Sequence, residues 1–417
     1  MRGWSPSLTI GLVLAAAFAG CGDDTAARPP NTTPDPNPDP DPNKPTTGAL
    51  CAAGQICTLA GTGIAGDGQD GLPARQTRLY LPQDTTVGPD GRLFVVDWNN
   101  HRIRVIDPDG TMRIIAGVGE LGLAADDPTT DRLNHPTNVA FDATGSPDEL
   151  WIAAWHNSRV KKVDLTTGTI TDVCGTGKRG FAGNDGPAAA ATLDLPVAIV
   201  FDAGGNMLIA DQANQMIRRV DRTTGMISTI AGTGHCADAI NPNPCVLNDG
   251  GPATAAGFHF PIGQMASPGG RIALATDGAI YVADTDNFRV RRIDTAGVIT
   301  TFAGTGTWGF AGDGDPAAAA QLGRVADVAV GPDGRVYIAD SDNDCVRVVS
   351  PDGIIATFAG RCGTPGFEGD DGPATAALLD RPSGVEVGRQ GEIYIADTHN
   401  QRIRVVYPQS PQSPQSP

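Results

Sequence analysis

Positive charge is scarce in this chain of 417 residues, which carries 30 lysines and arginines against 47 aspartates and glutamates. The formal net charge is therefore −17 at pH 7. Proteins that bind nucleic acid present a basic surface to the phosphates. The charge balance predicts that nucleic acid is not a partner of this chain.

The sequence also lacks an apolar run long enough to cross a bilayer as a helix, which takes about 20 residues. Its N-terminal apolar segment, residues 8–19, is shorter and is followed by Gly20-Cys21. A short apolar run with a small residue before a cysteine resembles the bacterial lipobox. We predict that residues 1–21 are a lipoprotein signal peptide and that Cys21 anchors the protein in the bacterial cell envelope. Because Gly22 follows the cysteine, we expect the outer membrane; an ordinary signal peptide is the alternative.

Apolar residues are almost absent over residues 22–48, where proline, aspartate, asparagine and threonine dominate. A segment of this composition cannot bury a core and stays extended. We predict a disordered tether there and a disordered tail at residues 409–417. Residues 49–408 contain no linker-like break, which predicts one domain.

What the chain has in place of such breaks is a repeat. The stretch Gly334–Gly360 reads GRVYIADSDNDCVRVVSPDGIIATFAG, with short strands separated by an Ala-Asp-x-x-Asn turn and a Pro-Asp-Gly turn. Strand-rich units at a nearly fixed period are typical of radial repetition. We predict an all-β, six-bladed β-propeller of four-stranded antiparallel blades. The six turns start at Asp97, Ala154 (which replaces the aspartate), Asp211, Asp284, Asp340 and Asp397.

The turn and the strand after it read Ala-Asp-x-x-Asn-x-Arg at residues 283–289 and 396–402. This pattern resembles the NHL-repeat β-propeller family, in the bacterial and teneurin-like variety with a long Gly-Asp-Gly loop. The resemblance covers about residues 56–408 and implies the fold. It does not fix a function, because such propellers serve many tasks.

The sixth copy ends after its third strand, at about Tyr407. Residues 51–61, just after the tether, match residues 350–360 when the two are aligned on their final glycines. We predict that this N-terminal strand completes blade six and closes the ring, leaving no internal edge unpaired.

The cysteines fit an oxidising compartment. Cys174 lies at the end of an apolar strand, and we expect a buried, inert thiol. Spacing alone leaves other pairings open. We expect disulfides at the closure, in the insertion before blade four and across blade five: Cys51–Cys57, Cys236–Cys245 and Cys345–Cys362.

Signals of chemistry are weak. A Gly-x-Gly-x-x-Gly pattern recurs, for example at residues 61–66, but an Ala-rich turn follows it where a nucleotide site needs a helix within a βαβ unit. The carboxylates of these loops lack the spacing of a calcium loop, so we favour turn capping and keep calcium as the alternative. These carboxylates are Asp67, Asp313 and Asp370.

Six-bladed lactonases and arylesterases hold calcium on the propeller axis. The equivalent inner-strand positions here include Asp84, Asn138 and Asp327, with Gln264 uncertain because of the insertion. Two carboxylates and an amide can form part of a calcium shell. Hydrolysis also needs a general base, and no residue is identified as one. We expect no cofactor and no catalysis, and keep axial calcium as the alternative.

The histidines show no metal-ligand spacing. His101, His156 and His399 fall on turns, and His135 falls in a connecting loop. We expect exposed turn residues.

Two tryptophans mark blades one and two. Trp98 and Trp155 follow the turn position that begins Ala-Asp-x-x-Asn, where the other four copies carry glutamine, threonine or serine. Sheets stack about 10 Å apart, so the two rings should stand side by side. Departures from a repeat are where function is expected, and exposed aromatic pairs anchor proteins and sugars. We predict a ligand site at Trp98, Trp155 and His156; the alternative is that each tryptophan covers its own blade.

The sequence thus predicts a monomeric, lipid-anchored and non-enzymatic binding module. Its ligand would be an envelope or extracellular protein or a glycan, held on one face of the propeller. The first alternative is a calcium-dependent lactonase or esterase. The second is a scaffold that only holds other envelope proteins.

Overall fold

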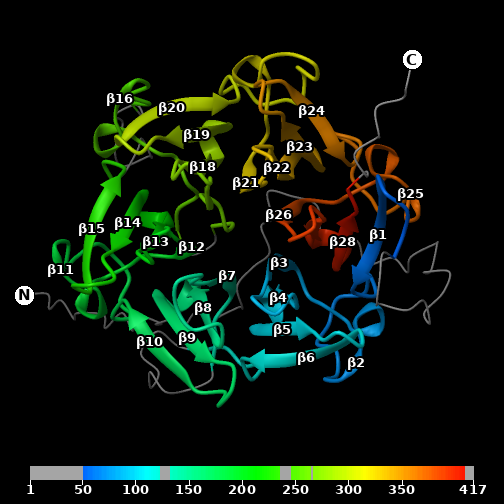
Figure 1. Ribbon diagram of the computed structural model, residues 1–417, viewed down its shortest axis with the longest axis horizontal. Coiled ribbons are helices and arrows are strands. Elements are labelled where there is room, and N and C mark those ends of the chain that lie inside the picture. The colour runs from blue at the N-terminus through cyan, green and yellow to red at the C-terminus, as the bar shows by residue number, and fades with distance from the viewer. Residues whose placement is uncertain (1–49, 123–131, 235–245, 264–265, 409–417) are drawn as a thin grey trace, which may run out of the picture.

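The computed structural model describes residues 50–122, 132–234, 246–263 and 266–408. Six small antiparallel sheets stand around one axis, with strands such as β3, β7, β12, β21 and β26 nearest the centre (Figure 1). The prediction of an all-β, six-bladed propeller is confirmed. The lipobox, the tether, and Cys236 with Cys245 lie outside the described residues. Within the described ranges, no helix has the length and apolar character needed to cross a membrane.

Blade one shows how the repeated sequence forms a sheet. From the axis outward it contains β3 (Pro82–Val87), β4 (Leu93–Asp97), β5 (Arg102–Ile106) and β6 (Thr111–Ala116), each antiparallel to the next. Every residue of β4 is buried. Neighbouring elements cover both of its faces, which is why its sequence is a continuous apolar run up to the aspartate. The turn between β5 and β6 places Gly110 at a φ of 83°, a conformation that suits glycine.

The other five blades repeat this order from axis to rim. Their strands are, in blade two, β7 (Pro136–Phe141), β8 (Glu149–Ala154), β9 (Arg159–Asp164) and β10 (Ile170–Cys174); in blade three, β12 (Pro196–Phe201), β13 (Met207–Asp211), β14 (Met216–Val220) and β15 (Met226–Ala231); in blade four, β17 (Ile272–Leu274), β18 (Ile280–Asp284), β19 (Arg289–Ile293) and β20 (Val298–Ala303); in blade five, β21 (Val325–Val330), β22 (Val336–Asp340), β23 (Cys345–Val349) and β24 (Ile355–Ala359); and in blade six, β26 (Pro382–Val387), β27 (Ile393–Asp397) and β28 (Arg402–Val406).

Four strands per blade is an incomplete description. In four sheets the Gly-Asp-Gly loop that enters the blade adds a two-residue strand to the outer edge. A 3-10 turn follows each added strand, as the Ala-rich sequence suggests, and a fifth occupies the same place before blade five. Several of these loops contain the Gly-x-Gly-x-x-Gly pattern. The added strands are β2 (Leu72–Pro73), β11 (Gly186–Pro187), β16 (Gly251–Pro252) and β25 (Gly372–Pro373), and the 3-10 turns are η1 (Ala74–Gln76), η4 (Ala188–Ala190), η6 (Ala253–Ala255), η8 (Ala317–Ala319) and η10 (Ala374–Ala376).

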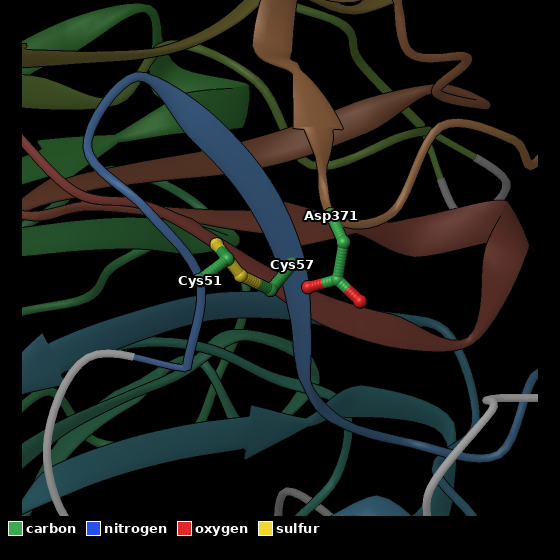
Figure 2. A group of neighbouring side chains, drawn as sticks. All are labelled: Cys51, Cys57 and Asp371. Carbon is green, nitrogen blue, oxygen red and sulfur yellow. A yellow bond between two sulfur atoms is a disulfide. The ribbon is translucent and has the colours of Figure 1, made fainter.

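The N-terminal strand closes the ring as predicted. Strand β1 (Gln55–Ala60) pairs with β28 on one side and with β25 on the other. Its Ile56 lies opposite Val406, in the register that the match to blade five requires. A disulfide between Cys51 and Cys57 ties the residues just before β1 to this strand (Figure 2).

Three other cysteines bear on the expectations. Cys345 and Cys362 form a disulfide that links β23 to the loop after β24. Cys174 is a buried free thiol, and burial raises its pKa to about 12. A thiol that stays protonated is a poor nucleophile, so the expected inert character holds.

Apolar side chains pack between adjacent blades. Phe94 and Ile103 of blade one, for example, share a buried cluster with Val139 and Ile152 of blade two. Removing a side chain of this size from water stabilises the fold by about 1.5–3 kcal/mol. Blade-to-blade contact therefore fixes where the turns of neighbouring blades meet.

Candidate functional site

The Ala-Asp-x-x-Asn turn is a 3-10 turn with a buried aspartate. In blade one the turn is η2 (Trp98–Asn100), and Asp97 Oδ1 accepts a hydrogen bond from the amide of Tyr80 at 2.8 Å. Asp97 Oδ2 accepts from Asn100 Nδ2 at 2.9 Å and from Arg104 Nε at 2.7 Å. Asp97 joins the loop that enters the blade to the turn and to β5.

The loop carboxylates for which calcium binding was the alternative prediction also bind arginine. Asp67 accepts a hydrogen bond from Arg104 Nη2 at 2.6 Å, and Asp370 accepts one from Arg404 Nη2 at 2.5 Å. In blade five Arg347 Nη2 donates to Asp313 in the same way. Each guanidinium is completely buried and lies between a turn carboxylate and a loop carboxylate. A guanidinium thus supplies the positive charge at these loops.

Blade two replaces this network with one of its own. Ala154 has no carboxylate, and the arginine position of β9 is Lys161. Lys161 Nζ donates to Asp172 of β10 at 2.8 Å, and Arg159 Nε lies 2.9 Å from the same carboxylate. The missing turn carboxylate is therefore compensated by one from the outer strand.

The two tryptophans lie side by side, with ring centroids 6.3 Å apart. Trp155, in η3 (Trp155–Asn157), is 1% exposed, and its Nε1 donates to Gln212 Oε1 of blade three at 3.1 Å. Trp98 is half-buried. The expectation of an exposed pair is thus wrong for Trp155, because its ring packs into the core of blades three and four. Trp308, in the loop before blade five, is the more exposed tryptophan at 56%.

Three histidines gather around these rings. The ring of His135 lies 4.4 Å from Trp98 and 4.4 Å from His101, measured between centroids. His156 stacks on Trp155 at 4.1 Å, and its Nδ1 lies 3.0 Å from His135 Nδ1. His101 and His135 are buried and His156 is half-buried, so the expectation of exposed turn residues is wrong. We call these five side chains the aromatic patch.

Burial controls the charge of the patch. It lowers the pKa of His101 to about 4, assisted by Arg102, and that of His156 to about 4, assisted by Arg179. Burial and the two neighbouring imidazoles lower the pKa of His135 to about 2. All three rings are therefore neutral at pH 7, and each can both donate and accept a hydrogen bond.

The three imidazoles do not converge on one point as metal ligands do. Among the described residues, one group of three potential ligands brings its atoms together, formed by Cys51, Cys57 and Asp371. The two cysteines there are joined in a disulfide, and the carboxylate of Asp371 lies beside it (Figure 2). Thiolates bind metals and disulfides do not, so this group is not a metal site as it stands.

The inner strands bring Asp84, Asn138 and Asp327 to the same level of the axis. Each lies opposite the residue that precedes the turn position of its blade. In blade four the amide of Ala283, at that same position, donates to the carbonyl of Arg271. The residue of blade four at this level of the axis is therefore Arg271 and not Gln264. Gln264 lies outside the described residues.

Arg271 is 1% exposed and lies among these groups. Its Nη1 is 3.5 Å from Asp84 Oδ1 and 3.4 Å from Asp327 Oδ2. Nη1 also donates to the carbonyls of Gln83 and Ser383, at 3.0 and 3.1 Å. Burial raises the pKa of Asp84 to about 7 although Arg271 lowers it, and burial likewise raises the pKa of Asp327.

Comparison with known proteins identifies the repeat. A family model described as the teneurin NHL domain matches residues 56–249, and one for the NHL repeat matches residues 322–349 and 379–406. The chain belongs to the NHL-repeat β-propeller family. It is 29% identical over 367 residues to Teneurin-m of Drosophila melanogaster. The matched region covers 82% of this chain and 12% of that protein. The NHL propeller thus spans about an eighth of the length of that relative.

Other relatives and solved structures agree on the fold. The propeller is 28% identical over 252 residues to the chloroplastic protein SUPPRESSOR OF QUENCHING 1 of Arabidopsis thaliana, covering 58% of this chain and 22% of that protein. An auxiliary nutrient binding protein from Bacteroides thetaiotaomicron superposes with a TM-score of 0.58 at 16% identity, covering 84% of this chain and 75% of that one. Likeness at this identity shows the fold alone.

The axis of this NHL propeller does not fit a calcium ion. Calcium takes 6–8 oxygen ligands in proteins, and neighbouring positive charge opposes it. Here the carboxylates of Asp84 and Asp327 face the guanidinium of Arg271, and the amide of Asn138 donates to Asp84 Oδ2 at 2.7 Å. The predicted ligands are brought together, but around a cation that the protein itself supplies.

Proposed function

We propose that this NHL propeller is a non-enzymatic binding protein of the bacterial cell envelope. A lipid on Cys21 anchors it, and the tether of residues 22–48 separates the propeller from the membrane. Its ligand is an envelope or extracellular protein or a glycan. The observation that carries this proposal is the aromatic patch, where two tryptophans and three neutral histidines meet between blades one and two.

The patch has two layers. Trp98 and His156 are half-buried and form the accessible layer, whereas Trp155 and His135 are buried beneath them. Contacts with Gln212 and Asn99 hold the lower layer, since Trp155 Nε1 donates to Gln212 and His135 Nε2 lies 3.1 Å from Asn99 Oδ1. Rigid aromatic faces with polar edges bind protein and sugar surfaces at little cost in conformational entropy.

The pairing of Arg271 with the axial carboxylates favours binding over hydrolysis. A calcium-dependent lactonase or esterase polarises its substrate with an ion on the axis, and here Arg271 Nη1 lies within 3.5 Å of both carboxylates. The structurally similar Bacteroides thetaiotaomicron protein is an auxiliary nutrient binding protein, which fits the same proposal. A scaffold without a specific ligand remains the competing function, and the patch distinguishes the two.

The test is a crosslinking pull-down from intact envelopes with the anchored protein as bait. We expect Trp98→Ala/His156→Ala to lose the partner that wild type recovers, because both substitutions remove accessible rings. Trp308→Ala is the matched control, since it removes an exposed tryptophan from a loop on the far side of the ring. Equal recovery by the double variant, with an unchanged circular dichroism spectrum, contradicts the proposed site.

The anchor is tested separately. Cys21→Ser should release the protein from membranes without changing its thermal unfolding, because the tether separates the lipid from the propeller. Membrane fractionation that finds the variant still bound contradicts lipidation as the main attachment.

A further inference from the structure

A cavity of about 710 Å³ occupies the centre of the ring. Its walls come from the inner strands of all six blades, and its volume lies in the range of about 300–1,000 Å³ that small-molecule sites occupy. Strand β3 runs from Pro82, beside the turns, to Val87, and the lining continues to Pro89. The cavity therefore opens on the face opposite the aromatic patch.

Carboxyl groups outnumber guanidinium groups around the cavity. Asp84 and Asp327 line its closed end and share the single cation there, Arg271. Glu386 also lines the cavity, nearer to its mouth. It comes two residues after Gly384, which lies at the level of Asp84 on the axis. Three carboxyl groups thus face one space with one guanidinium at its end.

Two further charged groups belong to the lining, Asp142 and Arg389. Asp142 pairs with Arg222 Nη1 at 2.7 Å. Arg389 is exposed at the mouth, where its Nη2 donates to the carbonyl of Gly88 at 2.8 Å. Burial, together with the charges of Asp84 and Asp327, raises the pKa of Glu386 to about 8. At pH 7 the cavity holds protons that a bound cation could replace.

The geometry points to a ligand larger than a metal ion. Among the described residues, the carboxylates of Asp84, Asp327 and Glu386 do not form a group whose oxygens converge within reach of one ion. At the level of Glu386 the other inner strands place small or apolar side chains in the lining, among them Ala140, Val200 and Ala329. Charged groups at separate depths and apolar walls between them suit an organic molecule with an ammonium group.

We propose that the central cavity is a second binding site, for a small organic cation whose ammonium group pairs with Glu386 and whose carbon skeleton contacts the apolar walls. This inference stands apart from the aromatic patch. The ammonium lies between Glu386 and the axial carboxylates, and the deeper carboxylates remain paired with Arg271. A proton leaves Glu386 as the cation binds, so charge is conserved in the site.

Isothermal titration of the full-length protein tests the site, with 1,4-diaminobutane and choline as probes and 1,4-butanediol as the uncharged match. We expect at least one amine to bind, the diol not to bind, and Glu386→Gln to weaken the amine at least tenfold. Affinity should rise from pH 6 to pH 9, and the heat should differ between phosphate and Tris buffers because a proton is released. Glu392→Gln, an acid of the same blade outside the lining, should bind as wild type does.

Three outcomes overturn the proposal. Neither amine binds better than the diol; Glu386→Gln binds an amine as tightly as Glu392→Gln does; or calcium alone binds and displaces the amine. Because the variant differs from wild type by one isosteric group, its circular dichroism spectrum and unfolding midpoint verify that it folds. A failed pull-down at the aromatic patch would leave these results unchanged.

Discussion

Arg271 of blade four donates a hydrogen bond from Nη2 to the backbone carbonyl of Thr137 in blade two, at 2.7 Å. The same guanidinium reaches Gln83 in blade one, Asp327 in blade five and Ser383 in blade six. One side chain therefore links five of the six blades at the axis. At the axial position considered for calcium, the protein places its own guanidinium.

We predict that Arg271→Met destabilises the protein by about 3–5 kcal/mol at pH 7, the usual cost of leaving buried charge without a partner. Asp84 and Asp327 would then face each other without a cation. Adding Asp84→Asn and Asp327→Asn to the same variant should recover much of the loss. Urea denaturation measures all three proteins. An Arg271→Met variant as stable as wild type would show that the axial pairs contribute nothing.

The closing strand gives a second prediction. Deleting residues 50–60 removes β1 and leaves β28 and β25 without their shared neighbour. Both edges then expose unpaired amides and carbonyls, and buried Ile56 and Cys57 are lost from the core. We expect a large fall in the thermal midpoint and a tendency to aggregate. An unchanged midpoint is incompatible with closure by this strand.

The aromatic patch makes stability depend on pH. Its histidines have pKa values near 4 and 2, below the ordinary 6.5, so the unfolded chain binds more protons once the pH falls below about 6.5. Above that pH, protonation of these histidines does not lower the free energy of unfolding. Between about pH 6.5 and pH 4, each histidine lowers it by up to about 1.4 kcal/mol per pH unit as the pH falls.

His135→Gln keeps a polar side chain near Asn99 but does not titrate. Between pH 6.5 and pH 4 its free energy of unfolding should fall less steeply than that of wild type. Buried carboxyl groups with raised pKa values act in the opposite direction, and they are common to both proteins. His259→Gln, outside the patch, controls for the loss of a histidine. Parallel curves for wild type and His135→Gln would refute burial of a neutral imidazole.

Blade two offers a test of its substitute network. Asp172→Asn removes the carboxylate that serves buried Lys161, and we expect a loss of about 1.5–3 kcal/mol, the range for hydrogen bonds to charged groups. Asp148→Asn, in the β7–β8 connection of the same blade, should change stability by less than about 0.5 kcal/mol. Urea denaturation compares the two. If both variants lost the same stability, Asp172 would contribute only through the net charge of the protein and not through its contact with Lys161.

The sequence was sufficient for the parts of the fold that repeat. Turn spacing predicts six blades, and the likeness of residues 51–61 to residues 350–360 predicts the closure. Arg271 could not be found this way, because the insertion before blade four shifts its inner strand out of the period and points to Gln264. The register is fixed by the pairing of β17 with β18 and by the hydrogen bond from Ala283 to Arg271.

The aromatic patch was half visible in the sequence. Trp98 and Trp155 occupy equivalent turn positions, so their proximity follows from the stacking of adjacent blades. His135 precedes the first proline of its blade, as Leu81 and Leu195 do in theirs, and all three have a positive φ. The repeat thus marks the position of His135, but the place of its ring beneath Trp98 depends on packing. The burial of Trp155 depends on Gln212, a residue of the next blade. The sequence pattern of a single repeat does not predict contacts between side chains of different repeats.

The most direct test of the account is the calcium content of the protein after purification in a calcium buffer and desalting, measured by elemental analysis. With Arg271 paired to Asp84 and Asp327, we predict far less than one calcium per chain. A content near one per chain that disappears in Asp84→Asn/Asp327→Asn would contradict the axial role of Arg271 and favour the calcium-dependent hydrolase.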